Sequence, residues 1–223
     1  MICIEKLRYR SLAIDYLSIR RGITSLIGPN GSGKTTLLKL CAGITVPDVG
    51  SITVEKKNPR ETDIGWVNEF PDRNFLFDIP EDEIVSPLRF QHIQPDEIDR
   101  RKAEIRQRLG LDHFPDRSIR ELSGGEKVLV ALAGAMITNP RVLILDEFDS
   151  HIDARTTKRI KRVLSESQIP FILHSTQDME NAKESDHIIF LENNRIRHSG
   201  TPEIVFSGLK ETPYYPLSWK WRA

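Results

Sequence analysis

The sequence lacks any long apolar run. No stretch of its 223 residues approaches the roughly 20 consecutive apolar residues with which a helix crosses a bilayer. The opening residues, MICIEKLRYR, alternate like a strand and contain no apolar core of a secretory signal. These absences argue against an integral or exported protein, so we expect a cytoplasmic location.

Cysteine is scarce and the net charge is zero. Cys3 and Cys41 are too few for a disulfide framework, so we expect two small buried thiols in a reducing compartment. The 32 basic and 32 acidic side chains cancel, which leaves no overall attraction to nucleic acid or to an anionic membrane. We therefore expect no nucleic-acid partner.

What is present is the pattern of an α/β protein with a helical insertion. Strands are expected at 2–7, 12–19, 23–27, 50–55, 64–67, 142–146, 170–174 and 187–192. Helices are expected at 35–42, 154–166 and 179–184, with a last helix after Thr201. Residues 71–137 are polar and helix-periodic, with Ile98, Ile105 and Leu109 on one helix face. Strands that alternate with helices favour a mostly parallel sheet.

The strongest motif follows the third expected strand. It fits the pattern G-x-x-x-x-G-K-[ST] and comprises Gly28, Pro29, Asn30, Gly31, Ser32, Gly33, Lys34 and Thr35, followed by Thr36. The glycines let backbone N–H groups turn inward as an anion nest, to which the helix N-terminus adds its dipole. Lys34 can reach the β- and γ-phosphates of ATP, and the Thr35 hydroxyl suits Mg²⁺. A chance match has a probability under about 1% over the chain, so we expect an ATP-binding loop.

Two further segments bear on the same chemistry. The apolar run VLILD ends in Asp146 and Glu147, where Asp146 suits the Mg²⁺ shell and Glu147 can polarise an attacking water. A simple capped strand is the alternative, but the position downstream of a phosphate loop favours catalysis. Ser123, Gly124 and Gly125 open another helix and form a second anion-facing N-terminus. A closed head-to-tail dimer lets two such termini face one nucleotide from opposite sides.

Together these motifs resemble the ATPase subunits of ATP-binding cassette (ABC) transporters. The segments GWVNEFPDRNFLFD, LSGGEK and ALAGAM are most similar to energy-coupling-factor and cobalt-type importers. The resemblance implies an α/β fold with a RecA-like P-loop core, a mixed and mostly parallel sheet, an N-terminal antiparallel β subdomain and an inserted helical subdomain. It implies one ATPase domain over 1–223, with 1–70 and 138–223 as the nucleotide-binding core and 71–137 as the helical signature subdomain.

The resemblance also assigns residue roles. Residues 28–36 correspond to the Walker A loop and 142–147 to Walker B, with Glu147 as the catalytic glutamate. The signature motif, which contacts the γ-phosphate held by a partner subunit, corresponds to Ser123, Gly124 and Gly125 with Glu126. Asp153 belongs to the D-loop near the dimer seam. Tyr9, 25 residues before Lys34, stands where an aromatic stacks on adenine; an ordinary sheet aromatic is the alternative, and Tyr16 is a second choice.

The same resemblance implies ligands, partners and location. The ligands are ATP and Mg²⁺. The partners are a second ATPase subunit, identical or different, and integral membrane subunits that take up a vitamin or a metal ion. The chain would then lie on the inner face of the cell membrane as a peripheral protein.

Several positions depart from the family. Glu69 replaces a glutamine that contacts Mg²⁺ and the attacking water, so it can bind the ion but adds negative charge beside the γ-phosphate. Gln177 replaces the switch histidine; it can donate a hydrogen bond but cannot become cationic. His174 should point to the other face of its strand. Phe148 and Asp149 replace the usual proline and threonine. We expect secure ATP binding and slow hydrolysis, or a partner that supplies a competent site.

Three questions stay open at this stage. Phe70, Phe75 and Phe77 either attach the helical insert to the core or line a groove for a short helix of a membrane subunit. The aromatic tail PYYPLSWKWRA packs on the core or on a partner. Besides a transport ATPase, a soluble ABC protein of the repair or translation type and a regulatory subunit that clamps ATP without hydrolysis are alternatives. The first of these usually has two cassettes or a long coiled coil, and neither occurs in this sequence.

Overall fold

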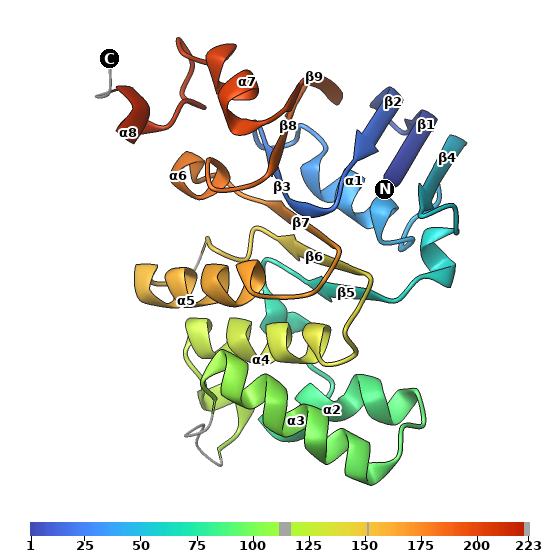
Figure 1. Ribbon diagram of the computed structural model, residues 1–223, viewed down its shortest axis with the longest axis vertical. Coiled ribbons are helices and arrows are strands. Elements are labelled where there is room, and N and C mark those ends of the chain that lie inside the picture. Colours follow the sequence, from blue (N-terminus) through green and yellow to red (C-terminus); the bar gives the residue numbers. More distant parts are fainter. Residues whose placement is uncertain (112–116, 151, 221–223) are drawn as a thin grey trace.

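The computed structural model describes residues 1–111, 117–150 and 152–220, which contain two β-sheets (Figure 1). The smaller sheet pairs β1 (Ile2–Tyr9) antiparallel with β2 (Leu12–Ile19) on one side and β4 (Val49–Val54) on the other. Apolar and polar residues alternate along β1 and β2, so one face is buried and the other exposed. The antiparallel N-terminal strands are as predicted.

The larger sheet has the strand order β5-β6-β7-β3-β8-β9. Its strands are β3 (Gly22–Ile27), β5 (Ile64–Val67), β6 (Val142–Asp146), β7 (Phe171–Ser175), β8 (His187–Glu192) and β9 (Arg195–Gly200). All neighbours are parallel except β8 and β9. Every residue of β6 and β7 is buried, as in strands that are covered on both faces. The prediction of a mixed, mostly parallel sheet is therefore confirmed.

Strand β9 is absent from the sequence prediction. Its residues, RIRHSG, include a single apolar side chain, Ile196, so no alternation of apolar and polar residues predicts a strand there. The turn before it places Asn193 and Asn194 at φ angles of +50° and +58°, a conformation that asparagine tolerates better than most residues. A tight asparagine turn therefore returns the chain as an edge strand beside β8.

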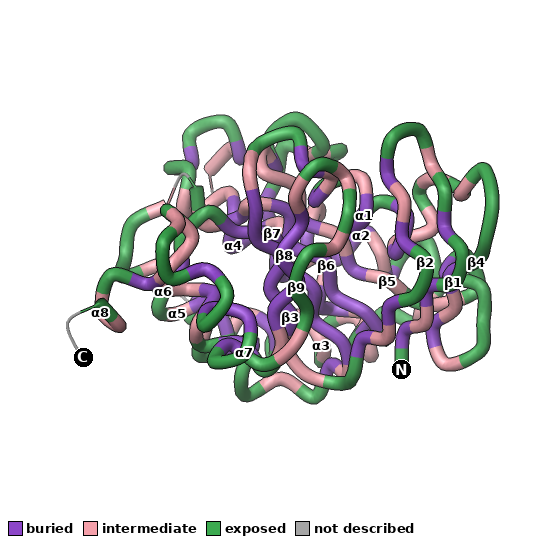
Figure 2. The backbone as a smooth tube through the Cα atoms, turned by 90° about the horizontal axis from the view of Figure 1, so that it is seen from above, coloured by how far each residue is buried: buried purple, intermediate pink, exposed green. Residues whose placement is uncertain are grey.

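Helix α1 (Lys34–Cys41) joins the two sheets. Its buried leucines, Leu37, Leu38 and Leu40, belong to one cluster with apolar residues of β1, β2, β6 and β7. Figure 2 shows β6 and β7 as buried throughout and β1 and β2 as buried in part. Burial raises the pKa of the Cys41 thiol to about 12. Cys3 is only partly buried, so the expectation of two buried thiols holds for Cys41 alone.

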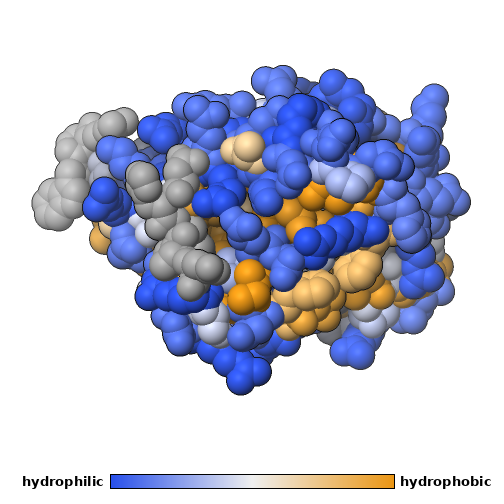
Figure 3. Space-filling model, turned by 90° about the horizontal axis from the view of Figure 1, so that it is seen from below, coloured by the Kyte–Doolittle hydropathy of each residue, from blue (hydrophilic) through white to orange (hydrophobic). Residues whose placement is uncertain are grey.

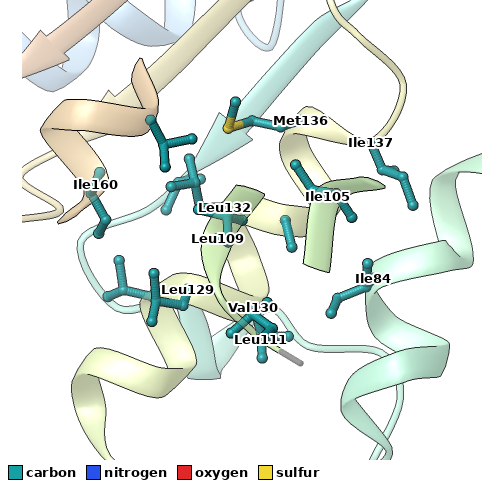
Figure 4. Close-up of a cluster of buried hydrophobic side chains, with 14 of the residues drawn as sticks. Ile84, Ile105, Leu109, Leu111, Leu129, Val130, Leu132, Met136, Ile137 and Ile160 are labelled. Carbon is teal, nitrogen blue, oxygen red and sulfur yellow. The ribbon is translucent and has the colours of Figure 1, made fainter. Parts of the chain in front are cut away.

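Three helices lie together beyond β5 and β6 (Figure 1). They are α2 (Pro80–Phe90), α3 (Pro95–Leu109) and α4 (Gly124–Met136). Their shared cluster includes Ile84, Leu109 and Leu132 (Figure 4). On the expected face of α3, Ile105 and Leu109 are buried, and Ile98 packs against them while partly exposed. Short 3₁₀ turns at Pro59–Glu61, Pro71–Arg73 and Ile119–Glu121 connect these elements.

Of the remaining helices, the first packs against α3 in the same apolar cluster, and the others lie at the other end of the sheet (Figure 1). They are α5 (Ala154–Ser165), α6 (Met179–Ala182), α7 (Pro202–Ser207) and α8 (Leu217–Lys220). The described part of the aromatic tail, 213–220, packs on its own chain, because Trp219 lies edge-on to Phe206 with ring centroids 5.5 Å apart. The last three tail residues, 221–223, fall outside the described residues. Glu180 also accepts a hydrogen bond from Ser218 N (3.0 Å). No helix in the described part of the chain is both long and apolar enough to cross a membrane.

Candidate nucleotide site

The loop after β3 adopts a backbone that glycine accepts and other residues resist. The φ angle is +139° at Gly28, +76° at Gly31 and +101° at Gly33, where L side chains are strained. A Cβ on Gly28 would lie 2.0 Å from the carbonyl oxygen of Leu191, so packing against β8 adds a second constraint. Gly33 is the N-cap of α1 and offers no side-chain cap. The N–H groups of the first helical turn are thus left to bind an anion.

Two buried polar groups in the loop fit a bound phosphate. Ser32 is 4% exposed, and its Oγ has no hydrogen-bond partner among the described residues. Lys34 is 5% exposed, and its ammonium donates to the carbonyl oxygens of Gly28 (3.0 Å) and Pro29 (3.3 Å). A buried polar atom without a partner costs about 1–3 kcal/mol. A phosphate oxygen would offset that cost, so these residues fit a nucleotide triphosphate.

Asp146 connects the end of β6 to the phosphate loop. Its Oδ1 accepts hydrogen bonds from Ser175 Oγ (2.6 Å) and Thr35 Oγ1 (3.1 Å). Hydroxyl and carboxylate oxygens are ligands that Mg²⁺ prefers, so the pair Thr35 and Asp146 fits that ion. No group of three or more His, Cys, Asp or Glu side chains within the described ranges could hold a metal by itself. Phosphate oxygens and water would complete the shell, as is usual for Mg²⁺.

Glu147 is bound at both carboxylate oxygens. The backbone turns sharply at this residue, with φ at +46°, which costs of order 1–3 kcal/mol. The turn is held by a hydrogen bond from Glu147 N to Ser175 Oγ (2.9 Å). Oε1 lies 3.5 Å from Lys34 Nζ, and Oε2 accepts from Gln177 Nε2 (2.9 Å). Gln177 Nε2 also donates to Asn30 Oδ1 (3.1 Å), so Gln177 joins the phosphate loop to Glu147.

A cleft of about 480 Å³ brings these segments together. The predicted residues that line it are Tyr9, Asn30, Gly31, Gly33, Lys34, Thr35, Thr36, Glu69, Glu147 and Gln177. Sequence reasoning missed four others, namely Arg10, Ser11, Leu12 and Asn194. The Arg10 guanidinium lies 5.4 Å from the Tyr9 ring centroid, and its adjacency to Tyr9 is the signal that could have found it. Asn194 lies in the turn before β9, which the sequence did not reveal.

Comparison with known proteins identifies the family. Residues 16–150 match the family model described as ABC transporter. The chain belongs to the ABC transporter family. An energy-coupling factor transporter ATP-binding protein, EcfA1 of Enterococcus faecalis, is 33% identical over 85% of this chain and 72% of its own length. The EcfA1 of Clostridioides difficile is 33% identical over 89% of this chain and 76% of its own.

A solved structure is also similar. It is cbiO1 from Clostridium perfringens, described as part of the ABC transporter complex cbiONQ. The two chains superimpose with a TM-score of 0.83 at 28% identity, covering 92% of this chain and 90% of that one. The P-loop fold predicted from the sequence is therefore the fold of an ABC ATPase.

The residues aligned with the ABC signature motif lie outside the cleft. Ser123 is the N-cap of α4, where its Oγ accepts from Glu126 N (3.3 Å) and Glu126 Oε2 accepts from Ser123 N (2.8 Å). Partial burial raises the pKa of Glu126, but hydrogen bonds from Ser123 and the nearby Arg117 outweigh it, so the pKa lies below its usual value. Ser123 and Gly124 are exposed, and neither they nor Gly125 line the nucleotide cleft of their own chain.

The D-loop and the strand histidine also lie apart from the cleft lining. Asp153 caps α5 by accepting from Thr156 N (2.9 Å), and a Cβ on Gly125 would lie 3.8 Å from its Oδ2. Asp153 thus neighbours the signature segment, while His151 of the same loop falls outside the described residues. His174 is buried with its Nε2 2.7 Å from Ser25 Oγ, in a separate cavity of about 740 Å³. It therefore does not replace the switch histidine in the cleft.

Proposed function

We propose that this chain binds and hydrolyses Mg²⁺-ATP as the ATP-binding subunit of an ABC importer for a vitamin or a metal ion. The observation that carries the proposal is the cleft in which Lys34, Thr35, Glu147 and Gln177 meet. The similarity to the EcfA1 and cbiO1 proteins supports the importer class. The proposed organisation is one ATPase domain, with a nucleotide-binding core at 1–70 and 138–223 and a helical signature subdomain at 71–137.

In this proposal the loop 28–36 binds the phosphates. Lys34 neutralises the β- and γ-phosphates, and the Ser32 hydroxyl gains the partner that it lacks within the described chain. Thr35, Asp146 and Glu69 would hold Mg²⁺, which would supply positive charge to the phosphate oxygens. Tyr9 stacks on the adenine, and Arg10 lies beside it. A charge on Glu69 would oppose the development of further negative charge at the γ-phosphate, which is one reason to expect slow turnover.

Glu147 is the proposed catalytic carboxylate. Its Oε1 faces Lys34 Nζ at 3.5 Å. When the γ-phosphate of ATP competes for that ammonium, Oε1 becomes free to orient an attacking water. Gln177 keeps Oε2 in place by its hydrogen bond (2.9 Å). Because an amide neither titrates nor relays a proton, Gln177 can orient the carboxylate but cannot stabilise developing charge as a cationic histidine does.

The proposed active unit is a head-to-tail pair of ATPase subunits. Ser123 and Gly124 are exposed at the start of α4, and the capping box leaves the remaining N–H groups of the first turn available. Ser123, Gly124, Gly125 and Glu126 would then face the nucleotide of the partner, with Asp153 at the seam. The pair is closed, because each subunit contributes a phosphate loop to one cleft and a signature segment to the other.

A groove of about 310 Å³ between β5, α2 and α4 is the proposed contact with membrane subunits. Trp66, Phe75 and Pro87 line it. Phe75 also packs against the helical cluster. It can therefore both attach the helical insert to the core and line a groove for a short helix, the two alternatives that the sequence left open. Figure 3 shows that apolar surface also gathers among polar atoms on the lower face of the molecule, where α2 and α3 lie in Figure 1. A short amphipathic helix fits such a groove, which would place the chain peripherally on the inner face of the membrane.

Glu147→Gln and Lys34→Ala test the enzymatic proposal. Glu147→Gln should lower the single-turnover rate of ATP hydrolysis at least about 100-fold and leave nucleotide binding intact, because it removes only the carboxylate charge. Lys34→Ala should weaken nucleotide binding itself. Unchanged turnover in Glu147→Gln would remove Glu147 from its role. ATP binding without any turnover in the wild type, mixed with membrane subunits, would instead favour a regulatory subunit that clamps ATP.

A further inference from the structure

Asp149 fixes the turn that carries Gln177. Its Oδ2 accepts hydrogen bonds from both Thr176 Oγ1 (2.7 Å) and Asn181 Nδ2 (2.8 Å). Thr176 is fully buried, and its Oγ1 accepts in turn from Asp178 N (3.0 Å). The residues on both sides of Gln177 are therefore tied, through one hydroxyl, to a carboxylate two residues beyond Glu147.

The neighbouring Phe148 strengthens the same connection. Its side chain is buried, and its ring lies edge-on to the His174 imidazole with centroids 6.0 Å apart. Between His174 and Thr176, Ser175 donates to Asp146 and accepts from Glu147 N. Phe148 and Asp149 thus contact the residues on either side of Ser175. The end of β6 and the end of β7 form one connected unit, built with the two residues that depart from the family pattern.

We propose that Asp149 is a positioning residue for ATP hydrolysis, which holds the turn 176–178 so that the Gln177 amide stays on Glu147 Oε2. The inference rests on the proposed ATPase function. Gln177 has a flexible side chain that acts through a single amide donor, and hydrogen bonds weaken steeply when distance or angle changes. A displacement of about 1 Å near the reacting groups can cost a factor of about 100 in rate. The anchor below Gln177 therefore matters for the rate and not for nucleotide binding.

Asp149→Ala and Asp149→Asn separate positioning from bulk stability. Asp149→Ala removes the acceptor, and it should lower kcat about tenfold or more. The KM for ATP and the nucleotide affinity should change less than about twofold, because Lys34 and the loop backbone, which bind the phosphates, contact neither Asp149 nor Thr176. Asp149→Asn should retain kcat within about threefold, since one amide oxygen can accept both hydrogen bonds as Oδ2 does. Asp15→Ala, which removes an exposed carboxylate on β2, is the matched control and should leave kcat unchanged.

A double-variant cycle tests whether Asp149 acts through Thr176. The pair Asp149→Ala and Thr176→Val should lower kcat no further than Thr176→Val alone. Multiplicative effects, a wild-type kcat in Asp149→Ala, or an equal loss in Asp149→Asn would each overturn the proposal. If the wild type does not hydrolyse ATP, the proposed function fails separately. Hydrogen exchange at Asp178 N then decides the positioning role: Asp149→Ala must speed it at least about tenfold, and unchanged exchange refutes the anchor.

Discussion

Replacing His174 by glutamine should remove a pH dependence of stability that the wild-type chain carries. The imidazole is 6% exposed, and its Nε2 lies 2.7 Å from Ser25 Oγ. Burial lowers its pKa from 6.5 to about 4; the Asp149 charge opposes this shift and the Lys161 charge adds to it. Glutamine can keep a hydrogen bond to Ser25 in a similar volume, but it does not titrate.

The sign and size follow from the two pKa values. Between about pH 6.5 and pH 4 the unfolded chain binds a proton on His174 that the native chain does not, so stability falls as the pH falls. Above pH 6.5 the imidazole is neutral in both the native and the unfolded chain, so His174 does not lower the stability there. A pH of 5 lies about 1.5 units below the unfolded-state pKa of 6.5, and each unit changes the free energy of unfolding by about 1.4 kcal/mol. The wild type should therefore lose about 2 kcal/mol at pH 5 through this residue.

Urea unfolding of both proteins at pH 7.5 and pH 5.0 measures the effect. Other groups titrate in the same way in the two proteins, so they cancel when the two pH-dependent losses are subtracted. The wild-type loss should exceed that of His174→Gln by about 2 kcal/mol. A difference below about 0.5 kcal/mol would refute the neutral, buried imidazole.

Three further substitutions test the site. Gly28→Ala should destabilise the protein by more than about 2 kcal/mol and weaken nucleotide binding, because its Cβ would meet the Leu191 carbonyl oxygen at 2.0 Å. Gly31→Ala, whose Cβ would meet nothing within 4 Å, should cost only the positive φ, about 1–2 kcal/mol; equal effects in thermal unfolding would contradict this difference. Gln177→His should raise the steady-state ATPase rate about fivefold or more. An unchanged phosphate-release rate would show that the glutamine does not limit turnover.

Local patterns predicted the segments whose chemistry is local. The phosphate loop and β6 carry their own signals, because glycine spacing fixes the anion nest and the four successive apolar residues before Asp146 require burial on both faces. Strand β9 carries no such signal, since its polar residues depend on pairing with β8 and on the asparagine turn. Arg10 and Asn194 escaped prediction because each lies in a short turn, one between β1 and β2 and one between β8 and β9, and only the folded chain brings both turns to the cleft.

The bonds around Asp149 illustrate a second limit. The sequence registers Phe148 and Asp149 as departures from a family pattern and gives no reason for them. Thr176 lies 27 residues after Asp149 in the chain. Only the parallel pairing of β6 with β7 brings the two residues within hydrogen-bonding distance. Long-range hydrogen bonds of this kind have no periodicity, so they become visible only once the strand order is known.

The departures at this site bear on its charge balance. Glu69 places a carboxylate in the cleft, and Gln177 removes a side chain that could become cationic, so both changes disfavour charge development at the γ-phosphate. Neither touches the signature segment at Ser123–Gly125, which in the proposed head-to-tail pair completes the cleft of the other subunit. A chain whose own cleft turns over slowly can therefore still be required for fast hydrolysis by its partner. Because the altered cleft and the signature segment of this chain serve different nucleotides, a pair of unlike subunits is the arrangement in which Glu69 and Gln177 slow transport least.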